Sequence, residues 1–300
     1  MTDNWKLEDM PAQNGRLAVV TGANVGIGFE SALALAGLGM EVIIAARNRM
    51  KAEEAISRII REYPESKVKF MHLDLSSMRS VNNFAAEFHR NHQKLDLLIN
   101  NAGIMMPPRN LTEDGFESQL ATNYLGHFVL TALLYPALQE TTGSRIISLS
   151  SIAHKYGSIR FDDIHFAKGY NRMKAYSQSK LACLIFAFEL DRRLRRAGAR
   201  PVSAAAHPGV ASTHLGRNMT PVLRYFFPRI GQPAREGALP VLRAALDQAV
   251  SGGEYFGPDG WNEMKGLPVR TGSSKLSQDQ AVADRLWKVT EKITGVPFLS

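Results

Sequence analysis

Tyr176 and Lys180 lie four residues apart in the segment KAYSQSK, directly before the apolar run LACLIFAFEL. Residues at this spacing share one face of a helix, so both side chains are expected to project from the same side. A phenol with a pKa of about 10 exchanges protons poorly at neutral pH, and bringing that pKa to about 7 needs roughly 4 kcal/mol. A cation about 4 Å away supplies about that much at an effective dielectric of 20. The pair can therefore act as a general acid, although the same spacing also fits a solvated helix face.

A glycine-rich turn follows the first apolar run of the chain, RLAVV at 16–20. It reads TGANVGIG and places Gly22, Gly26 and Gly28 before a helix expected to begin near Ile27. Glycines there let the backbone approach a pyrophosphate, and the helix N-terminus offers free N–H groups and the positive end of its dipole. The spacing differs from the common G-x-G-x-x-G, but its place after the first strand favours dinucleotide binding.

The second apolar run, EVIIAA at 41–46, ends without the acidic residue that many dinucleotide folds use to hold the ribose 2′-hydroxyl. Arg47, Asn48 and Arg49 follow instead. Cations at this place suit a 2′-phosphate through charge-assisted hydrogen bonds, so we expect NADP(H) in preference to NAD(H). The alternative is that the two arginines lie on the solvent face of the next helix.

Six short β-prone runs alternate with amphipathic windows of roughly 12 to 25 residues. The runs are 16–20, 41–46, 67–73, 94–100, 144–150 and 200–206. This alternation predicts an α/β fold, a single-domain, Rossmann-like, doubly wound parallel sheet in three α/β/α layers. Residues from about 15 to 205 would form the cofactor-binding core and the catalytic helix, and 236–300 the C-terminal helices, last strand and tail.

The regular alternation stops at 207–235, where four prolines surround the aromatic cluster LRYFFPRI. A loop this long in a compact domain is often a lid, so we expect a substrate lid here. Its apolar residues between Arg224 and Arg229 would suit a hydrophobic carbonyl substrate. Alternatively, segment 219–230 touches an anionic membrane surface, or it packs against a second subunit of a homo-oligomer.

The composition is that of a soluble globular protein, with 45% hydrophobic and 21% charged residues among 300. The polar N-terminal stretch lacks the apolar region of a secretory signal, and no apolar run approaches the roughly 20 residues that span a bilayer. We therefore expect a cytoplasmic protein. The single cysteine, Cys183, cannot form an internal disulfide and is expected in the core.

The net charge of +8 favours an anionic partner such as a phosphorylated cofactor. The basic residues are dispersed and no nucleic-acid reading motif occurs, so nucleic acid is not expected as a partner. His127, His154, His207 and His214 lack the paired spacing of a zinc site, and no metal is expected. The sequence also lacks a G-x-S-x-G elbow after a strand, which argues against a hydrolase.

Seven motifs occur in a fixed order along nearly the whole chain. They are TGANVGIG, LDLS with Asp74, NNAG at 100–103, Asn123, Ser150-Ser151, Tyr176-x-x-x-Lys180 and Pro208-Gly209. Together they resemble the short-chain dehydrogenase/reductase family. The segments NNAGIMMPP, NYLGHF, SSIAHKYG and GPDGWNEMKG resemble its retinol dehydrogenase and WW-domain oxidoreductase branch. The resemblance implies an NADP(H)-dependent oxidoreductase that moves hydride between the nicotinamide and a lipophilic alcohol or carbonyl, such as an aldehyde, ketone, retinoid or steroid.

The resemblance also assigns catalytic roles. Tyr176 would be the general acid in carbonyl reduction and the base in alcohol oxidation. Lys180 would lower the phenol's pKa and hydrogen-bond the nicotinamide ribose, and Ser151 would steady the substrate oxygen. Asn123, a poor helix former in a helix interior, would anchor a water that leads protons to Lys180. Ser151 is chosen because the family's catalytic serine is the second of such a pair, and Ser150 would belong to the strand end.

The cofactor contacts follow from the same resemblance. Asp74 would meet the adenine amino group, or alternatively it caps the next helix. NNAG would pack beside the adenosine ribose, although it is also a good turn sequence. Pro208, Gly209 and Thr213 would contact the nicotinamide amide and leave one ring face open for hydride transfer. The full expected set is Thr21, Gly22, Asn24, Gly26, Ile27, Gly28, Arg47, Asn48, Asp74, Leu75, Asn101, Ala102, Gly103, Tyr176, Lys180, Pro208, Gly209 and Thr213.

Two other functions fit the same residues. One is reduction of a carbon–carbon double bond, because a tyrosine–lysine pair can also protonate carbon. The other is a non-catalytic, NADP-binding regulatory protein, because a fold alone does not fix function. The complete set of Asn123, Ser151, Tyr176 and Lys180 favours the enzyme.

Overall fold

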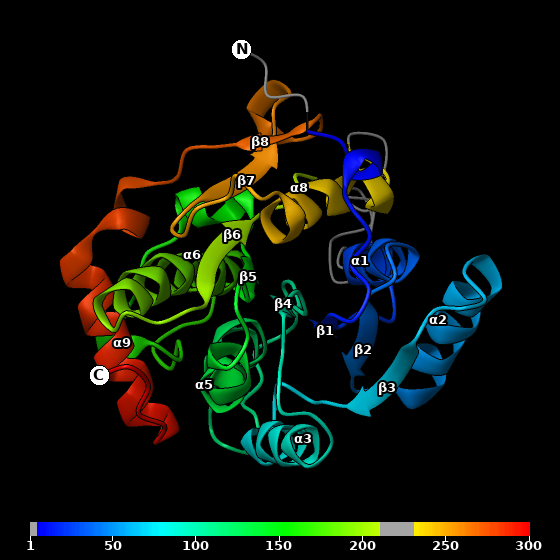
Figure 1. The fold of residues 1–300 in the computed structure, drawn as a ribbon. Helices are drawn as coiled ribbons and strands as arrows, with labels where there is room; N and C mark the ends of the chain where they lie inside the picture. Colours follow the sequence, from blue (N-terminus) through cyan, green and yellow to red (C-terminus); the bar gives the residue numbers. More distant parts are fainter. Residues whose placement is uncertain (1–4, 211–230) are drawn as a thin grey trace.

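An eight-stranded sheet forms the centre of the structure (Figure 1). The computed structural model describes residues 5–210 and 231–300. The strand order is β3-β2-β1-β4-β5-β6-β7-β8, and every neighbouring pair is parallel except β7 with β8. The order reverses between β1 and β4, which is the switch point of a doubly wound sheet. The predicted fold class is therefore confirmed.

The first six strands match the six predicted apolar runs. They are β1 Leu17–Thr21, β2 Glu41–Ala46, β3 Val68–His72, β4 Leu97–Asn100, β5 Arg145–Leu149 and β6 Val202–Ala206. Apart from the edge strand β3, their residues are buried almost without interruption, as expected for parallel strands covered on both faces. Two further strands, β7 Tyr255–Pro258 and β8 Pro268–Arg270, complete the sheet where one last strand was predicted. The second was missed because it has only three residues and begins with a proline.

Helices cover both faces of the sheet (Figure 1). One face packs against α1 Gly26–Gly37, α2 Arg49–Glu62 and α8 Ala234–Leu246. The other packs against α3 Met78–Asn91, α5 Gly126–Gln139, α6 Arg172–Arg196 and α9 Gln280–Thr294. The strand side chains alternate between the two cores, since Val19 faces the second helix group while Ala18 and Val20 face the first. The buried Cys183 belongs to the core on the α6 side, as predicted.

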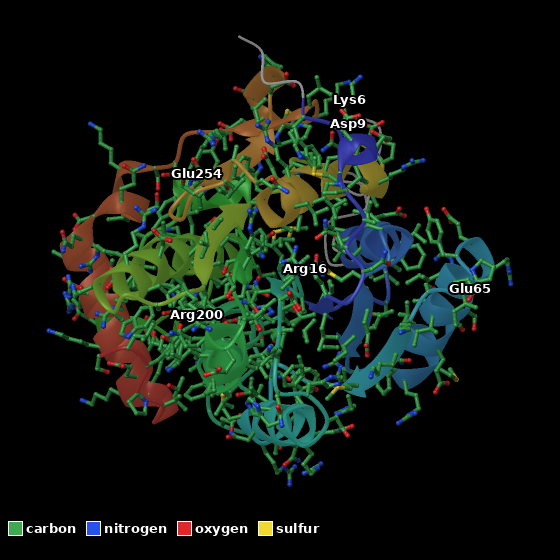
Figure 2. All side chains as sticks on the ribbon, viewed as in Figure 1. Lys6, Asp9, Arg16, Glu65, Arg200 and Glu254 are labelled. Carbon is green, nitrogen blue, oxygen red and sulfur yellow. The ribbon has the colours of Figure 1, made fainter. Side chains whose placement is uncertain are left out.

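Short helical segments connect these elements. The α4 turn Ser118–Leu120 runs through the π-helical segment η2 Ala121–Leu125 into α5. The 3₁₀ turns are η1 Leu7–Asp9, η3 Ile152–Tyr156, η4 Phe161–Asp163, η6 Trp261–Glu263 and η7 Lys275–Gln278. Charged side chains surround the outside of the molecule, from Lys6 and Asp9 near η1 to Glu65 beyond α2 (Figure 2).

The local sequence explains where helix α6 begins and ends. The side chain of Asn171 caps its N-terminus by accepting hydrogen bonds from the backbone N–H groups of Met173 and Lys174. Basic residues fill its last turn, where they oppose the negative end of the helix dipole. The helix stops before Gly198, whose φ of +60° is one that glycine adopts readily.

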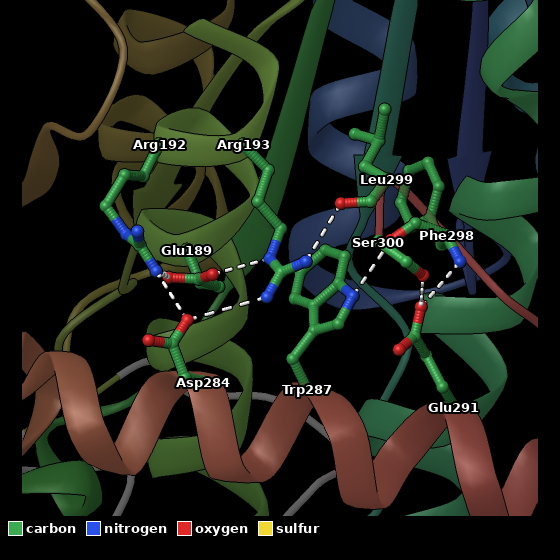
Figure 3. A network of polar contacts seen from close by, with 9 residues as sticks. All are labelled: Glu189, Arg192, Arg193, Asp284, Trp287, Glu291, Phe298, Leu299 and Ser300. Carbon is green, nitrogen blue, oxygen red and sulfur yellow. Dashed lines mark hydrogen bonds and ion pairs between the residues drawn. The ribbon is translucent and has the colours of Figure 1, made fainter. Parts of the chain in front are cut away.

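A polar network fastens the C-terminal half of α6 to α9 (Figure 3). Glu189 forms ion pairs with Arg192 and, at 2.5 Å, with Arg193. Asp284 of α9 lies 2.7 Å from Arg192, and the Arg193 guanidinium lies 4.4 Å from the ring centroid of Trp287. These contacts pair the two arginines of α6 with carboxylates and place the Arg193 guanidinium over the Trp287 ring.

The same network holds the end of the chain (Figure 3). Arg193 donates to the Leu299 carbonyl at 2.8 Å, and the Trp287 indole donates to the Phe298 carbonyl at 2.9 Å. Glu291 accepts a hydrogen bond from the Phe298 backbone N–H at 2.8 Å and another from the Ser300 hydroxyl. The C-terminal residues are thereby packed against α6 and α9.

Most of the expected lid at 207–235 lies outside the described residues. That part includes Thr213 and the aromatic cluster, so its expected contacts with substrate, membrane or a second subunit remain predictions. Within the described ranges, no helix combines the length and apolar composition needed to cross a membrane.

Candidate active site

The predicted site residues gather where the central strands end. Thr21 is the last residue of β1, Asn101–Gly103 follow β4, Ser150 and Ser151 follow β5, and Pro208 and Gly209 come soon after β6. In a doubly wound sheet this edge, at the switch point, is where ligands bind. Chain segments far apart in sequence are thus brought together on one edge.

Tyr176 and Lys180 are buried together on α6, each only 6% exposed. This burial excludes the alternative of a solvated helix face. The Tyr176 ring packs against Met105 and Met106. Lys180 Nζ donates a hydrogen bond to the Leu149 carbonyl at the end of β5, over 3.0 Å. The cation and the phenol therefore face the same edge of the sheet, as the spacing predicts.

Gly103 leaves space beside the lysine. A Cβ atom at this position would lie 3.2 Å from Asn123 Oδ1 and 3.5 Å from Lys180 Nζ. The last glycine of NNAG therefore lets the backbone pass close to both polar side chains, which is a physical reason for its residue type.

Asn123 lies in the π-helical turn between α4 and α5, where the Gly126 N–H bonds to the Ala121 carbonyl. Its side chain accepts from the Ile104 N–H at 2.8 Å and donates to the Ile104 carbonyl at 3.0 Å. It also donates to Ser179 Oγ at 2.9 Å, on α6. Asn123 thus ties the segment after NNAG to the helix that carries Tyr176 and Lys180. Single π-turns within helices are frequent at functional sites.

The two serines after β5 have different environments. Ser150 is buried, and its hydroxyl donates to the Lys180 backbone carbonyl at 2.8 Å. Ser151 is half-buried and begins η3, where its hydroxyl oxygen accepts the Ala153 N–H at 3.2 Å. Accepting that bond leaves the Ser151 hydroxyl proton available for another group. The two hydroxyl groups thus differ in what they can still donate, and the role of Ser151 toward a substrate oxygen stays a prediction.

The glycine turn after β1 leaves no space for side chains. Gly22 has a φ of +65°, and a Cβ there would come within 2.9 Å of the Ala102 Cβ. A Cβ on Gly28 would approach Asn101 Nδ2 to 2.4 Å. Helix α1 begins at Gly26 without a side-chain cap, so its first N–H groups face the same edge of the sheet unpaired by a capping side chain. A tight, uncapped turn of this kind fits a pyrophosphate.

His127 links this turn to Asn123, a role that the sequence reasoning missed. Its Nδ1 lies 2.9 Å from the Asn123 carbonyl, and its Nε2 lies 2.9 Å from Thr21 Oγ1. A carbonyl can only accept, so Nδ1 carries the proton and Nε2 accepts from the threonine. Thr21 Oγ1 in turn accepts the N–H groups of Asn101 and Ala102, both at 2.9 Å. Burial lowers the pKa of His127 to about 4, which keeps the ring neutral.

The adenosine end of the expected cofactor site carries an ion pair. Arg47, 68% exposed at its side chain, lies 3.5 Å from Asp74. Burial acts to raise the pKa of Asp74, but hydrogen bonds from Ser76 and the charge of Arg47 outweigh it and lower the pKa. The capping alternative for Asp74 is wrong, since the side chain that caps α3 is that of Ser77.

Other predicted cofactor residues have varied environments. The Asn48 side chain caps α2, and Arg49 pairs with Glu53 on its solvent face at 3.3 Å. The solvent-face alternative therefore describes Arg49 correctly. Asn24 is half-buried in the glycine turn, whereas Ile27 and Leu75 are buried. Residues 5–210 and 231–300 contain no group of three or more His, Cys, Asp or Glu side chains placed to hold a metal ion.

The chain is similar to known proteins in both sequence and structure. The short chain dehydrogenase family matches residues 16–222. Retinol dehydrogenase 13 of Homo sapiens is 40% identical over 293 residues, which cover 94% of this chain and 85% of that protein. Polyprenol dehydrogenase of Mus musculus is 39% identical over 296 residues, which cover 95% and 86%. A crystal structure of an uncharacterized protein from Mycobacterium paratuberculosis has a TM-score of 0.82 at 38% identity, covering 98% of each chain. The chain therefore belongs to the short-chain dehydrogenase family, in its retinol dehydrogenase branch.

Proposed function

We propose that this protein is an NADP(H)-dependent oxidoreductase that transfers hydride between the nicotinamide and a lipophilic alcohol or carbonyl. The observation that carries the proposal is the buried pair of Tyr176 and Lys180, which lies at the same edge of the sheet as Ser151 and Asn123. A buried phenol beside a buried cation is suited to proton transfer and is poorly explained by stability alone.

Each of these residues has a separate role in the proposed reaction. When bound, the cofactor supplies or accepts the hydride. In the reductive direction Tyr176 donates its hydroxyl proton to the carbonyl oxygen, and in the oxidative direction it takes the alcohol proton. Lys180, held by the Leu149 carbonyl, places its positive charge at the same edge of the sheet as the phenol. Ser151 donates a hydrogen bond to the same substrate oxygen and holds it near the phenol.

The fit of a dinucleotide rests on the glycine turn and on Arg47. The turn excludes side chains at Gly22 and Gly28, and α1 presents uncapped N–H groups to an anion. The exposed Arg47 guanidinium suits a 2′-phosphate, since within the described part of the chain its only polar contact is the weak 3.5 Å one with Asp74. Replacing Arg47 with Gln should weaken NADPH binding by roughly tenfold and leave NADH binding nearly unchanged. Equal losses for both cofactors would refute the NADP(H) preference.

A lipophilic substrate is supported by what surrounds the phenol. Met105 and Met106 pack against Tyr176, and methionine adapts to irregular apolar ligands. The similarity to retinol and polyprenol dehydrogenases points to the same class of substrate.

The proposal is tested by following NADPH and NADH consumption with a panel of lipophilic aldehydes, ketones and enones. Wild-type protein is compared with Tyr176→Phe, which removes the proton donor and little volume. NADPH-preferring turnover that falls by about 10²–10⁴ in the variant supports the proposal. Product analysis of the enone reactions separates carbonyl reduction from double-bond reduction. Tight NADPH binding without turnover of any member would favour the regulatory protein instead.

A further inference from the structure

Glu263 lies between two segments of the candidate site without belonging to either. It is in η6, on the connection between β7 and β8, far in sequence from both segments. Its Oε1 lies 2.7 Å from Lys155 Nζ, and its Oε2 lies 3.2 Å from His207 Nε2. Lys155 is in η3, the turn that Ser151 begins, and His207 directly precedes Pro208 and Gly209.

The His207 contact has a defined chemistry. The Gly209 N–H donates to His207 Nδ1 at 3.2 Å, so Nδ1 is unprotonated and the proton is on Nε2, which lies 3.2 Å from Glu263 Oε2. Both atoms are buried, and among the described residues neither makes a hydrogen bond of regular geometry, to the other or to any third group. The contact between them is therefore a close electrostatic contact of a carboxylate with a neutral imidazole. The imidazole is fully buried, and burial lowers its pKa, which keeps it neutral.

Glu263 is ionised across the physiological range. The contact with His207 is the largest cause, and with help from Lys155 and Thr271 it outweighs burial and brings the pKa of Glu263 to about 2. A carboxylate with an ammonium 2.7 Å from one oxygen and an imidazole nitrogen 3.2 Å from the other holds the two groups at a fixed separation.

The same connection holds the Pro208–Gly209 segment through its backbone. The Val210 N–H donates to the Met264 carbonyl at 2.8 Å, and a Cβ on Gly209 would lie only 2.4 Å from that oxygen. Gln232, buried and far along the chain, donates to the Pro208 carbonyl at 3.0 Å and accepts the Gly266 N–H at 3.1 Å. Residues 208–210 are thus fixed to the β7–β8 connection on more than one side.

The turn that Ser151 begins is also held by contacts of His154. His154 Nδ1 lies 2.7 Å from the Ser151 carbonyl, and the Ser274 N–H donates to His154 Nε2 at 3.2 Å. Lys155 is the next residue in this turn, so its ion pair with Glu263 is a direct link from the turn to the β7–β8 connection.

The backbone at Glu263 is unusual for its residue types. Asn262 has a φ of 49° and Glu263 a φ of 58°, so two consecutive non-glycine residues adopt the left-handed region. Such conformations are strained for residues other than glycine and concentrate at functional sites. A glycine would relieve the strain but would remove the carboxylate.

We propose that Glu263 is a positioning residue, which sets the separation between the turn that carries Ser151 and the Pro208–Gly209 segment that faces the nicotinamide. The inference rests on the proposed function and names a residue that acts through Lys155 and His207, without touching substrate or cofactor. Its removal should misplace the nicotinamide relative to the hydroxyl groups that hold the substrate oxygen.

The test compares Glu263→Gln with Lys155→Met and with the matched control Glu41→Gln. Glu41 forms a 2.6 Å ion pair with Lys69 at the start of β2, the strand end opposite the site. For each purified full-length protein, NADPH dissociation constants are measured by nicotinamide fluorescence, and kcat and KM with the best carbonyl substrate. Thermal unfolding is recorded in parallel.

Glu263→Gln should raise the NADPH dissociation constant by roughly tenfold and lower kcat by roughly ten- to hundredfold, with KM changed little, because small misplacements are costly for reaction geometry. Lys155→Met breaks only the link to the Ser151 turn, so it should lower kcat by about tenfold and leave NADPH binding unchanged. Glu41→Gln should change neither. A purely structural role would shift the unfolding temperature without this split between binding and turnover.

Glu263→Gln protein with NADPH affinity and kcat within about twofold of wild type would overturn the inference while leaving the proposed function intact. Wild-type protein that fails to bind NADPH would overturn the proposed function, and the positioning role with it. The exposed Lys155 keeps the test decisive if Glu263→Gln does not fold, since unchanged kcat in Lys155→Met would also refute the positioning role.

Discussion

The two halves of α6 both bury polar and charged side chains, but they pair them differently. In the C-terminal half Glu189 meets Arg192 and Arg193, so each charge faces its opposite. In the N-terminal half Lys180 has the Leu149 carbonyl as its partner, and the described residues provide no carboxylate for it. Removing one partner of a buried ion pair is strongly destabilising, whereas a buried cation without a counter-charge is itself costly and marks a candidate functional position.

The largest effect should come from replacing the unpaired cation. Lys180→Met keeps the length of the side chain and removes the buried positive charge one helical turn from Tyr176. We expect kcat/KM to fall by about a thousandfold, while the unfolding temperature stays the same or rises, because an apolar side chain is easier to bury than an unpaired cation. Enzyme assays and calorimetry on the same preparation check this. A loss of stability that matches the loss of activity would contradict the comparison.

The paired half should behave in the opposite way. Glu189→Gln leaves Arg192 and Arg193 with Asp284 as their remaining acidic partner. Because breaking a buried ion pair leaves uncompensated charge, we expect the free energy of unfolding to fall by about 3 kcal/mol. Below the unfolding temperature, kcat/KM should stay within about twofold of wild type, since the ion-pair partners of Glu189 among the described residues, Arg192 and Arg193, are not site residues. Urea unfolding followed by tryptophan fluorescence measures the first effect, and a tenfold loss of kcat/KM would refute the separation of the two halves.

Acid should destabilise the protein through a buried histidine of α5 that contacts the candidate site. His127, which joins Thr21 to the Asn123 carbonyl beside α6, has a pKa lowered by burial from 6.5 to about 4. The unfolded chain therefore binds a proton that the folded chain does not, and the stability is complete above pH 6.5 and lost as the pH falls toward 4. This difference in the pKa of His127 between the unfolded and the folded chain contributes about 3 kcal/mol to the free energy of unfolding, at 1.36 kcal/mol per pKa unit.

His127→Gln provides the control for this pH dependence. Its unfolding free energy should be lower at pH 7.5 and should fall less between pH 6.5 and 4 than that of wild type. His154 and His207 are buried as well, and their pKa values are also lowered. Wild type and His127→Gln should therefore both still lose some unfolding free energy as the pH falls. Identical slopes in the two proteins would show that His127 is not the group responsible.

The sequence predicted the layers of the fold and the shared helix face of Tyr176 and Lys180, for local reasons. Parallel strands buried on both faces appear as continuous apolar runs, and a four-residue spacing on α6 places Tyr176 beside Lys180. His127, Gln232 and Glu263 were missed as parts of the site because their contacts join residues distant in sequence. The His207 and Glu263 side chains, for example, meet only after β7 has joined the sheet next to β6. A short polar segment such as GPDGWNEMKG gives no periodic signal that would reveal such a contact.

The smallest effect should come from replacing Asp284, the exposed carboxylate that contacts the paired half of α6. Asp284 contacts Arg192 at 2.7 Å, but its side chain is 41% exposed, against 2% for Glu189. Solvent screening reduces the value of an exposed pair, and Glu189 would still contact both arginines in Asp284→Asn. We therefore expect a loss of only about 0.5 kcal/mol in the free energy of unfolding, and a smaller one in 0.5 M salt. If Asp284→Asn cost as much as Glu189→Gln, the stability of this half would come from the contact between α6 and α9. It would then not come from the burial of the carboxylate, and the contrast with Lys180 would lose its physical basis.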